Sequence, residues 1–82
     1  MNTKTFEEVC IGDLLAPDPD VFLLGDRWIV KEKTSDYILI HIYHCGIELP
    51  KNNWYQFKIL KNNFIELWCR GETLDDWLKK FK

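Results

Sequence analysis

The chain lacks most of the residues from which catalytic motifs are built. Ser35 is its only serine, its four glycines are isolated from one another, and it contains no Gly-rich phosphate-binding sequence. A hydrolase serine sits in a GxSxG sequence at a strand-to-helix turn, and Ser35 has no such context. His44 and Cys45 are adjacent, but in a predicted strand adjacent side chains point to opposite faces. We therefore expect a protein that is not an enzyme.

Paired cysteines are also missing. Cys10, Cys45 and Cys69 form an odd number without a CxxC pair, which indicates no disulfide framework. His41, His44 and Cys45 are candidate metal ligands, but along a strand His41 and Cys45 are separated by ~13 Å, too far to bind one ion. We expect no metal, no cofactor and a reducing, cytoplasmic location.

Long apolar runs and polybasic runs are absent as well. No stretch reaches the ~20 apolar residues of a membrane span, and the first twenty residues carry acids and prolines where a signal peptide needs an apolar segment. The net charge is −2, with a pI of about 5.6. The acids near the beginning lack the spacing of a calcium loop and are expected to be solvated: Glu7, Glu8, Asp13, Asp18 and Asp20. We expect no membrane association and no broad phosphate-binding surface.

Aromatic residues are what the sequence has in abundance. Hydrophobic residues make up 46% of the chain, which contains four Trp, five Phe and three Tyr among 82 residues. Each aromatic side chain can bury ~150–250 Å², so a few of them supply a core that a short chain otherwise lacks. The composition predicts one folded domain spanning residues 1–82.

Residues 27–45 have the pattern of a β-hairpin. Apolar residues alternate on both sides of a polar turn at 34–36. The resulting register pairs Lys33 with Tyr37, Val30 with Ile40 and Trp28 with Ile42. One face is then apolar, and the other is mixed, carrying Lys31, Leu39, His41 and Tyr43.

Residues 54–70 predict a second hairpin. The sequence Lys-Asn-Asn-aromatic occurs at 51–54 and again at 61–64, and its second copy is interpreted as the turn. The register pairs Ile59 with Ile65, Phe57 with Leu67 and Tyr55 with Cys69 on an apolar face. The other face carries Trp54, Leu60, Phe64 and Trp68 among Gln56, Lys58, Glu66 and Arg70.

The end of the chain has helical periodicity. Leu74, Trp77, Leu78 and Phe81 follow an i, i+3, i+4, i+7 spacing, and Thr73 is a candidate N-cap. We expect a helix over 74–81 that docks on the rest of the domain, with the aromatic face of the second hairpin or the main face of the sheet as alternatives. Earlier in the chain we expect a turn or helix-like start over 6–12, a strand near 13–16, a rigid loop at 16–20 and a short strand at 21–24.

These elements predict an α+β fold, a small twisted antiparallel sheet or SH3-like barrel of about five strands with one C-terminal helix. Its function is expected to be that of a non-catalytic protein-interaction module, of the kind used as a small phage or mobile-element inhibitor or adaptor. The expected partner-binding residues are Trp54, Phe64, Trp68 and Arg70, because Trp and Arg dominate binding hot spots. The alternative is a small β-barrel that binds single-stranded nucleic acid on the same aromatic face.

Overall fold

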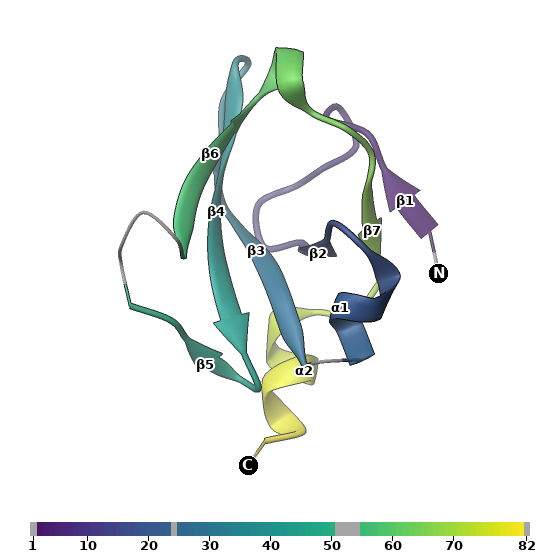
Figure 1. The fold of residues 1–82 in the computed structure, drawn as a ribbon, viewed down its shortest axis with the longest axis vertical. Coiled ribbons are helices and arrows are strands. Elements are labelled where there is room, and N and C mark those ends of the chain that lie inside the picture. Colours follow the sequence, from purple (N-terminus) through teal and green to yellow (C-terminus); the bar gives the residue numbers. More distant parts are fainter. Residues whose placement is uncertain (1, 24, 51–54, 82) are drawn as a thin grey trace.

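The computed structural model describes residues 2–23, 25–50 and 55–81. It shows a small α+β protein with one open sheet of seven strands and a short C-terminal helix (Figure 1). Along the sheet the strands follow the order β1-β7-β2-β3-β4-β5, and β6 also pairs with β4. The recorded strand pairs are antiparallel.

The strands differ greatly in length. β3 and β4 are the long central pair, and the others are short. Their bounds are β1 (Asn2–Lys4), β2 (Leu14–Ala16), β3 (Asp26–Lys33), β4 (Tyr37–His44), β5 (Ile47–Glu48), β6 (Gln56–Leu60) and β7 (Leu67–Cys69). The helical elements are α1 (Pro19–Leu23), the 3-10 turn η1 (Lys61–Asn63) and α2 (Leu74–Lys79).

The β3–β4 hairpin confirms the first predicted register over most of its length. Trp28 pairs with Ile42, and Val30 pairs with Ile40. The register then shifts between Val30 and Glu32, so that Lys33 lies opposite Ile38 and not Tyr37. Such a bulge increases the local twist of the strand. Here it lies a few residues before the turn that joins β3 to β4.

The predicted hairpin over 54–70 is wrong. β6 pairs with β4, placing Ile59 opposite Ile38. β7 lies elsewhere in the sheet, between β1 and β2. Residues 61–63 form η1, so the chain leaves the β6 edge at this point and does not fold back on itself. The predicted apolar face is only partly right: Phe57, Ile59, Leu67 and Cys69 belong to the core. Tyr55 and Ile65, predicted on the same face, are exposed, and Phe64, predicted on the other face, packs against the core.

The predicted strand at 21–24 is also wrong, and the predicted loop at 16–20 extends only to Asp18. Pro19 begins α1. The side chain of Asp18 accepts a hydrogen bond from the backbone N–H of Asp20 at 2.8 Å. An Asp before a Pro at the first helical position is a helix-start signal, because proline has no N–H to leave unsatisfied there. The strand predicted near 13–16 is present as β2.

One face of the sheet encloses the main core. Side chains from β2, β3, β4, β6 and β7 meet there with two residues of the loop that follows β1. The buried members are Phe6, Val9, Leu15, Val30, Ile38, Ile40, Leu67 and Cys69, and the partly buried Trp28, Ile42, Phe57, Ile59 and Phe64 pack against them. Because β6 and β7, which lie toward opposite edges of the sheet, contribute side chains to this one cluster, the sheet is curled around it.

The opposite face is covered by α2. Its Trp77 is 1% exposed and packs with Leu14, Ile29 and Tyr43. Thr73 caps the helix by accepting a hydrogen bond from the backbone N–H of Asp76 at 3.1 Å, as the sequence predicts. The helix therefore docks on the back of the central strands. Among the described residues, no helix has the length and apolar character needed to cross a membrane.

Candidate functional site

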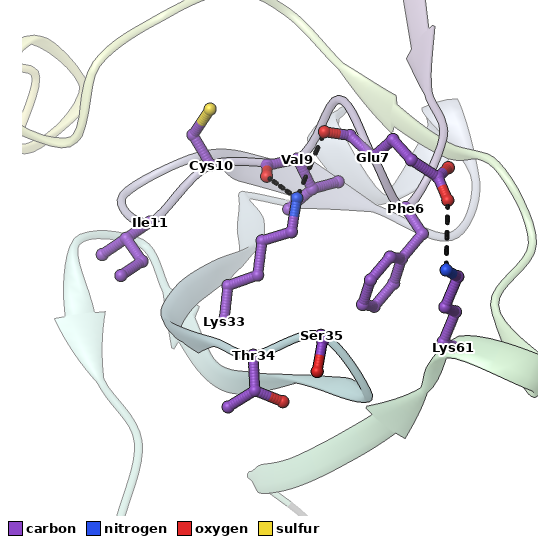
Figure 2. Close-up of a pocket in the computed structure, with 9 residues that line it drawn as sticks. All are labelled: Phe6, Glu7, Val9, Cys10, Ile11, Lys33, Thr34, Ser35 and Lys61. Atoms are coloured by element: carbon purple, nitrogen blue, oxygen red, sulfur yellow. Dashed lines mark hydrogen bonds and ion pairs between the residues drawn. The ribbon is translucent and has the colours of Figure 1, made fainter.

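A concave surface lies beside the loop that joins β1 to β2. This loop, residues 5–13, crosses the end of the β3–β4 hairpin and leaves a pocket of about 730 Å³ against it. We call it the loop pocket (Figure 2). It is lined by Phe6, Glu7, Val9, Cys10, Ile11, Lys33, Thr34, Ser35 and Lys61.

The floor of the loop pocket is aromatic and flanked by two amines. Figure 2 shows the Phe6 ring between the side chains of Lys33 and Lys61. Their Nζ atoms lie 5.2 and 5.8 Å from the ring centroid, within the range of cation–π attraction. On its other side Phe6 meets Phe64 edge to face, with 5.6 Å between centroids. The floor is thus anchored in the main core and does not depend on the loop alone.

Lys33 fixes the position of the loop over this floor. Its Nζ donates hydrogen bonds to the carbonyl oxygen of Val9 at 2.7 Å and to that of Glu7 at 3.2 Å. An ammonium has three donors, so one remains beyond these two contacts. The bulge in β3 precedes Lys33 and changes the register of this end of the strand.

Ion pairs and local hydrogen bonds hold the two ends of the loop. Lys4 donates to the Asp13 carboxylate at 2.9 Å, and this hydrogen bond raises the pKa of Lys4 above its ordinary value. The carboxylate of Glu8 accepts from the backbone N–H and hydroxyl of Thr5, which lowers the pKa of Glu8. The 5–13 loop is therefore a folded unit with its own internal bonds.

The rim of the loop pocket is apolar on one side and charged on the other. Ile11 is 66% exposed. Across the pocket, Lys61 forms an exposed pair with Glu7 at 3.7 Å. Exposed ion pairs of this kind contribute little stability, so they exchange partners at low cost. The pocket can accept an apolar group next to a carboxylate.

The structure does not gather the four predicted contact residues on one hairpin face. Trp54 lies outside the described residues. Phe64 packs against the main core, whereas Trp68 lies on β7 between Leu67 and Cys69, which are both buried in that core. Strand alternation places Trp68 on the other side of β7. Arg70 is exposed, with its guanidinium carbon 5.8 Å from the Phe22 ring centroid. Their role in binding stays a prediction.

A second, smaller pocket of about 230 Å³ includes one of these residues. Phe64 lines it together with apolar side chains of β3, β6 and β7, and the Trp28 and Phe57 rings meet there edge to face at 5.0 Å. The remaining lining residues are Pro17, Ile59, Asn63, Ile65 and Leu67. Phe64 thus lies between the two pockets, because it also touches Phe6.

The histidines engage carboxylates. His41 Nδ1 lies 2.7 Å from Glu48 Oε1, and this contact lowers the pKa of Glu48. His44 Nδ1 contacts the Asp26 carboxylate. Within the described ranges, no three His, Cys, Asp or Glu side chains converge as a metal site would require.

Sequence reasoning missed the loop pocket. The signals available were Ile11, one of several apolar residues mixed with acids at 6–15, and Lys33 next to the predicted turn. Neither indicates that the loop crosses the hairpin. Comparisons with protein-family models, with curated proteins and with solved structures found no match.

Proposed function

We propose that the protein is a non-catalytic protein-interaction module and that the loop pocket is its contact surface. The observation that carries this proposal is the exposure of Ile11, 66%, at the rim of a pocket with an aromatic floor. A single exposed isoleucine is ordinary on a protein surface, but Ile11 borders a pocket with an aromatic floor, and burying such a side chain is worth about 1.5–3 kcal/mol. A partner protein supplies that burial.

The charges around the pocket favour a particular kind of partner segment. Lys33 retains a donor beyond its two loop contacts, and the Lys61–Glu7 pair is long and exposed. A carboxylate carried by the partner complements both amines. We therefore propose a segment in which an aliphatic or aromatic side chain, which enters beside Phe6, is next to Asp or Glu. A small phage or mobile-element inhibitor or adaptor would use such a surface to occupy one host protein.

The matched pair of variants that tests this function is Ile11→Asp and Ile47→Asp. Both isoleucines are exposed, at 66% and 69%, and Ile47 lies on β5, outside the residues that line the pocket. Peptides selected on the wild-type protein from a random display library are the probe. We expect them to share an apolar residue beside an acid and to bind Ile11→Asp at least tenfold more weakly, with Ile47→Asp unchanged. Equal binding by the two variants would reject the pocket as the contact surface.

Single-stranded nucleic acid is the competing partner class, and the same variants separate it. The aromatic platform expected for it relied on the 54–70 hairpin, which the structure replaces with two separate strands. Titration with an oligothymidylate at low salt tests the alternative directly, because phosphate contacts weaken steeply as salt rises. Tight, salt-dependent binding that survives Ile11→Asp would favour the nucleic-acid function.

We also propose that the curled sheet is a partly open, SH3-like barrel. The chain passes from β6 on one side of the sheet to β7 on the other through η1 and three further residues, and both strands contribute to the same core. Nuclear Overhauser contacts between the backbones of β6 and β1, the strands at opposite edges of the sheet, would establish closure, and their absence would leave an open sheet. The free state of all three cysteines supports the proposed cytoplasmic location.

A further inference from the structure

The end of the molecule away from the 34–36 turn carries an arrangement of side chains that the interaction module does not use. β4 and β5 are joined by Cys45 and Gly46, and both have positive φ, 49° and 85°. Positive φ at both central residues is the requirement of a type I′ turn, which favours Asn or Gly and disfavours other side chains. A cysteine is therefore unexpected at the first of these positions.

The turn brings the thiol back to the histidine beside it. Cys45 Sγ lies 3.6 Å from His44 Nε2. The sequence predicts that these two side chains lie on opposite faces of a strand. This prediction is wrong, because β4 ends at His44 and Cys45 is the first residue of the turn that follows. The backbone N–H of Cys45 donates to the carbonyl of Gly25 at 2.9 Å, which fixes the turn against the start of β3.

The neighbourhood leaves room for sulfur at this place. A Cβ added at Gly25 would lie 2.9 Å from Cys45 Sγ, a contact too short for real atoms. The glycine at position 25 thus provides the space that the thiol occupies. Cys45 nonetheless remains exposed to solvent.

The third member of the arrangement orients the imidazole. The Asp26 carboxylate contacts His44 Nδ1. A carboxylate at Nδ1 favours the tautomer with the proton on that nitrogen, so that the unprotonated Nε2 faces the thiol. Nucleophile, base and orienting carboxylate are then in the order that activated nucleophiles require.

We propose that Cys45 is a nucleophilic thiol, with His44 as its base and Asp26 as a positioning residue, and that it exchanges with small disulfides. Cys45 Sγ attacks one sulfur of the disulfide while His44 Nε2 takes the thiol proton. A new S–S bond forms to Cys45, the original S–S bond breaks, and the departing thiolate takes the proton back from His44. The small disulfide is the oxidant: its leaving sulfur is reduced to a thiol while the Cys45 sulfur is oxidised to the mixed disulfide. Exchange passes charge from sulfur to sulfur and needs no oxyanion hole, unlike acyl transfer.

Cys10 is an internal control for this reaction. It is exposed like Cys45, but its recorded hydrogen bond goes to the carbonyl oxygen of Glu8, at 3.7 Å, and within the described part of the chain no histidine is hydrogen-bonded to its Sγ. The whole protein is treated with glutathione disulfide near neutral pH, and the mixed disulfide at each cysteine is followed over time by peptide mass spectrometry. A general base accelerates proton transfer by ~10²–10⁴ in enzymes, and for this exposed site we expect Cys45 to react about tenfold faster than Cys10.

His44→Gln keeps a polar side chain and removes the base. We expect it to bring the rate at Cys45 to within about twofold of the rate at Cys10, consistent with the loss of general-base catalysis, while the rate at Cys10 stays constant. Asp26→Asn tests the positioning role through the ring nitrogen shifts of His44, which change from one tautomer to a mixture. Equal rates at the two thiols in the wild-type protein would overturn the proposal. So would a fast Cys45 that is unaffected by His44→Gln.

Discussion

Two cations mark the two ends of β3, and they differ in what surrounds them. Arg27, near the beginning of the strand, is 3% exposed. It donates to the carbonyls of Phe22 and Asp26 and pairs with the Glu72 carboxylate at 2.7 Å. Lys33, at the end of the strand, also donates to two carbonyls, but it is only half-buried and has no carboxylate partner among the described residues.

The difference separates a closed end of the molecule from an open one. The Arg27 guanidinium lies 4.6 Å from the Phe22 ring centroid and 5.1 Å from that of Trp77, so it connects α1, β3 and α2. A charge buried this deeply requires its partner, because its desolvation is otherwise uncompensated. The Lys33 ammonium remains in contact with solvent and holds one loop. The first arrangement is structural, and the second leaves a surface that a partner can reach.

Removing the carboxylate from the closed end should have the greatest effect on stability. Glu72→Gln leaves the Arg27 guanidinium buried without its countercharge, and we expect a loss of about 3 kcal/mol in the free energy of unfolding, measured by urea denaturation. Arg27→Met combined with Glu72→Gln should recover part of this loss, because no unpaired charge remains. A single-variant loss below about 0.5 kcal/mol, the size of an ordinary surface substitution, would show that the pair is not structurally important.

At the open end, Lys33→Met keeps the aliphatic stem and removes the ammonium. We expect a loss of about 1–1.5 kcal/mol, below the full value of hydrogen bonds to a charged group because the site is partly solvated. Hydrogen exchange should quicken in residues 7–12 and remain unchanged around Trp77. Faster exchange throughout the molecule would mean that the loop is not a separate unit.

The cap of α2 gives a smaller effect at the closed end. Thr73→Ala removes the hydroxyl that accepts from the Asp76 N–H, and we expect a loss of about 1 kcal/mol. The neighbouring Asp75→Ala, which removes an acid from the same first turn but no capping bond, is the control. Equal losses in the two variants would assign the effect to helix charge and not to the cap.

The smallest predicted effect is the loss of the Glu48–His41 contribution to stability at acidic pH. Contact with His41 lowers the pKa of Glu48 from its ordinary 4.5. The stability this pair provides is therefore present above the ordinary pKa and disappears as the pH falls through the folded-state pKa. Because Glu48 is 39% exposed, screening limits the contribution to less than about 1 kcal/mol. In Glu48→Gln the free energy of unfolding should decrease slightly less steeply as the pH falls below 4.5. An unchanged dependence on pH in this range would show that the pair contributes nothing.

The sequence predicted the local features of this fold better than the distant ones. The β3–β4 register follows from alternation on both sides of a short polar turn, and this information is contained within 19 residues. The C-terminal helix and its Thr73 cap are local in the same way. The failure over 54–70 has the opposite cause, since the apolar face of β6 fits β4 as well as it fits β7. Alternation indicates which face of a strand is buried, but it does not indicate which strand pairs with it.

The candidate site was beyond local patterns for a similar reason. Ile11 and Lys33 are 22 positions apart, and the loop pocket exists because Lys33 reaches the carbonyls of Glu7 and Val9. No periodicity encodes such a contact. α1, in contrast, has a local signal in Asp18-Pro19, but the apolar residues that follow it also fit a short strand.

The proposal that the loop pocket, at the Lys33 end of β3, binds a partner is tested most directly by mapping where a peptide binds. Amide chemical shifts of the wild-type protein are recorded while a peptide with an apolar residue beside an acid is added. The proposed contact surface predicts that the changes gather in residues 5–13, at the 34–36 turn and at Lys61, with the amides around Arg27 and Trp77 unaffected. Changes that gather instead around Trp68 and Arg70, or on α2, would contradict it.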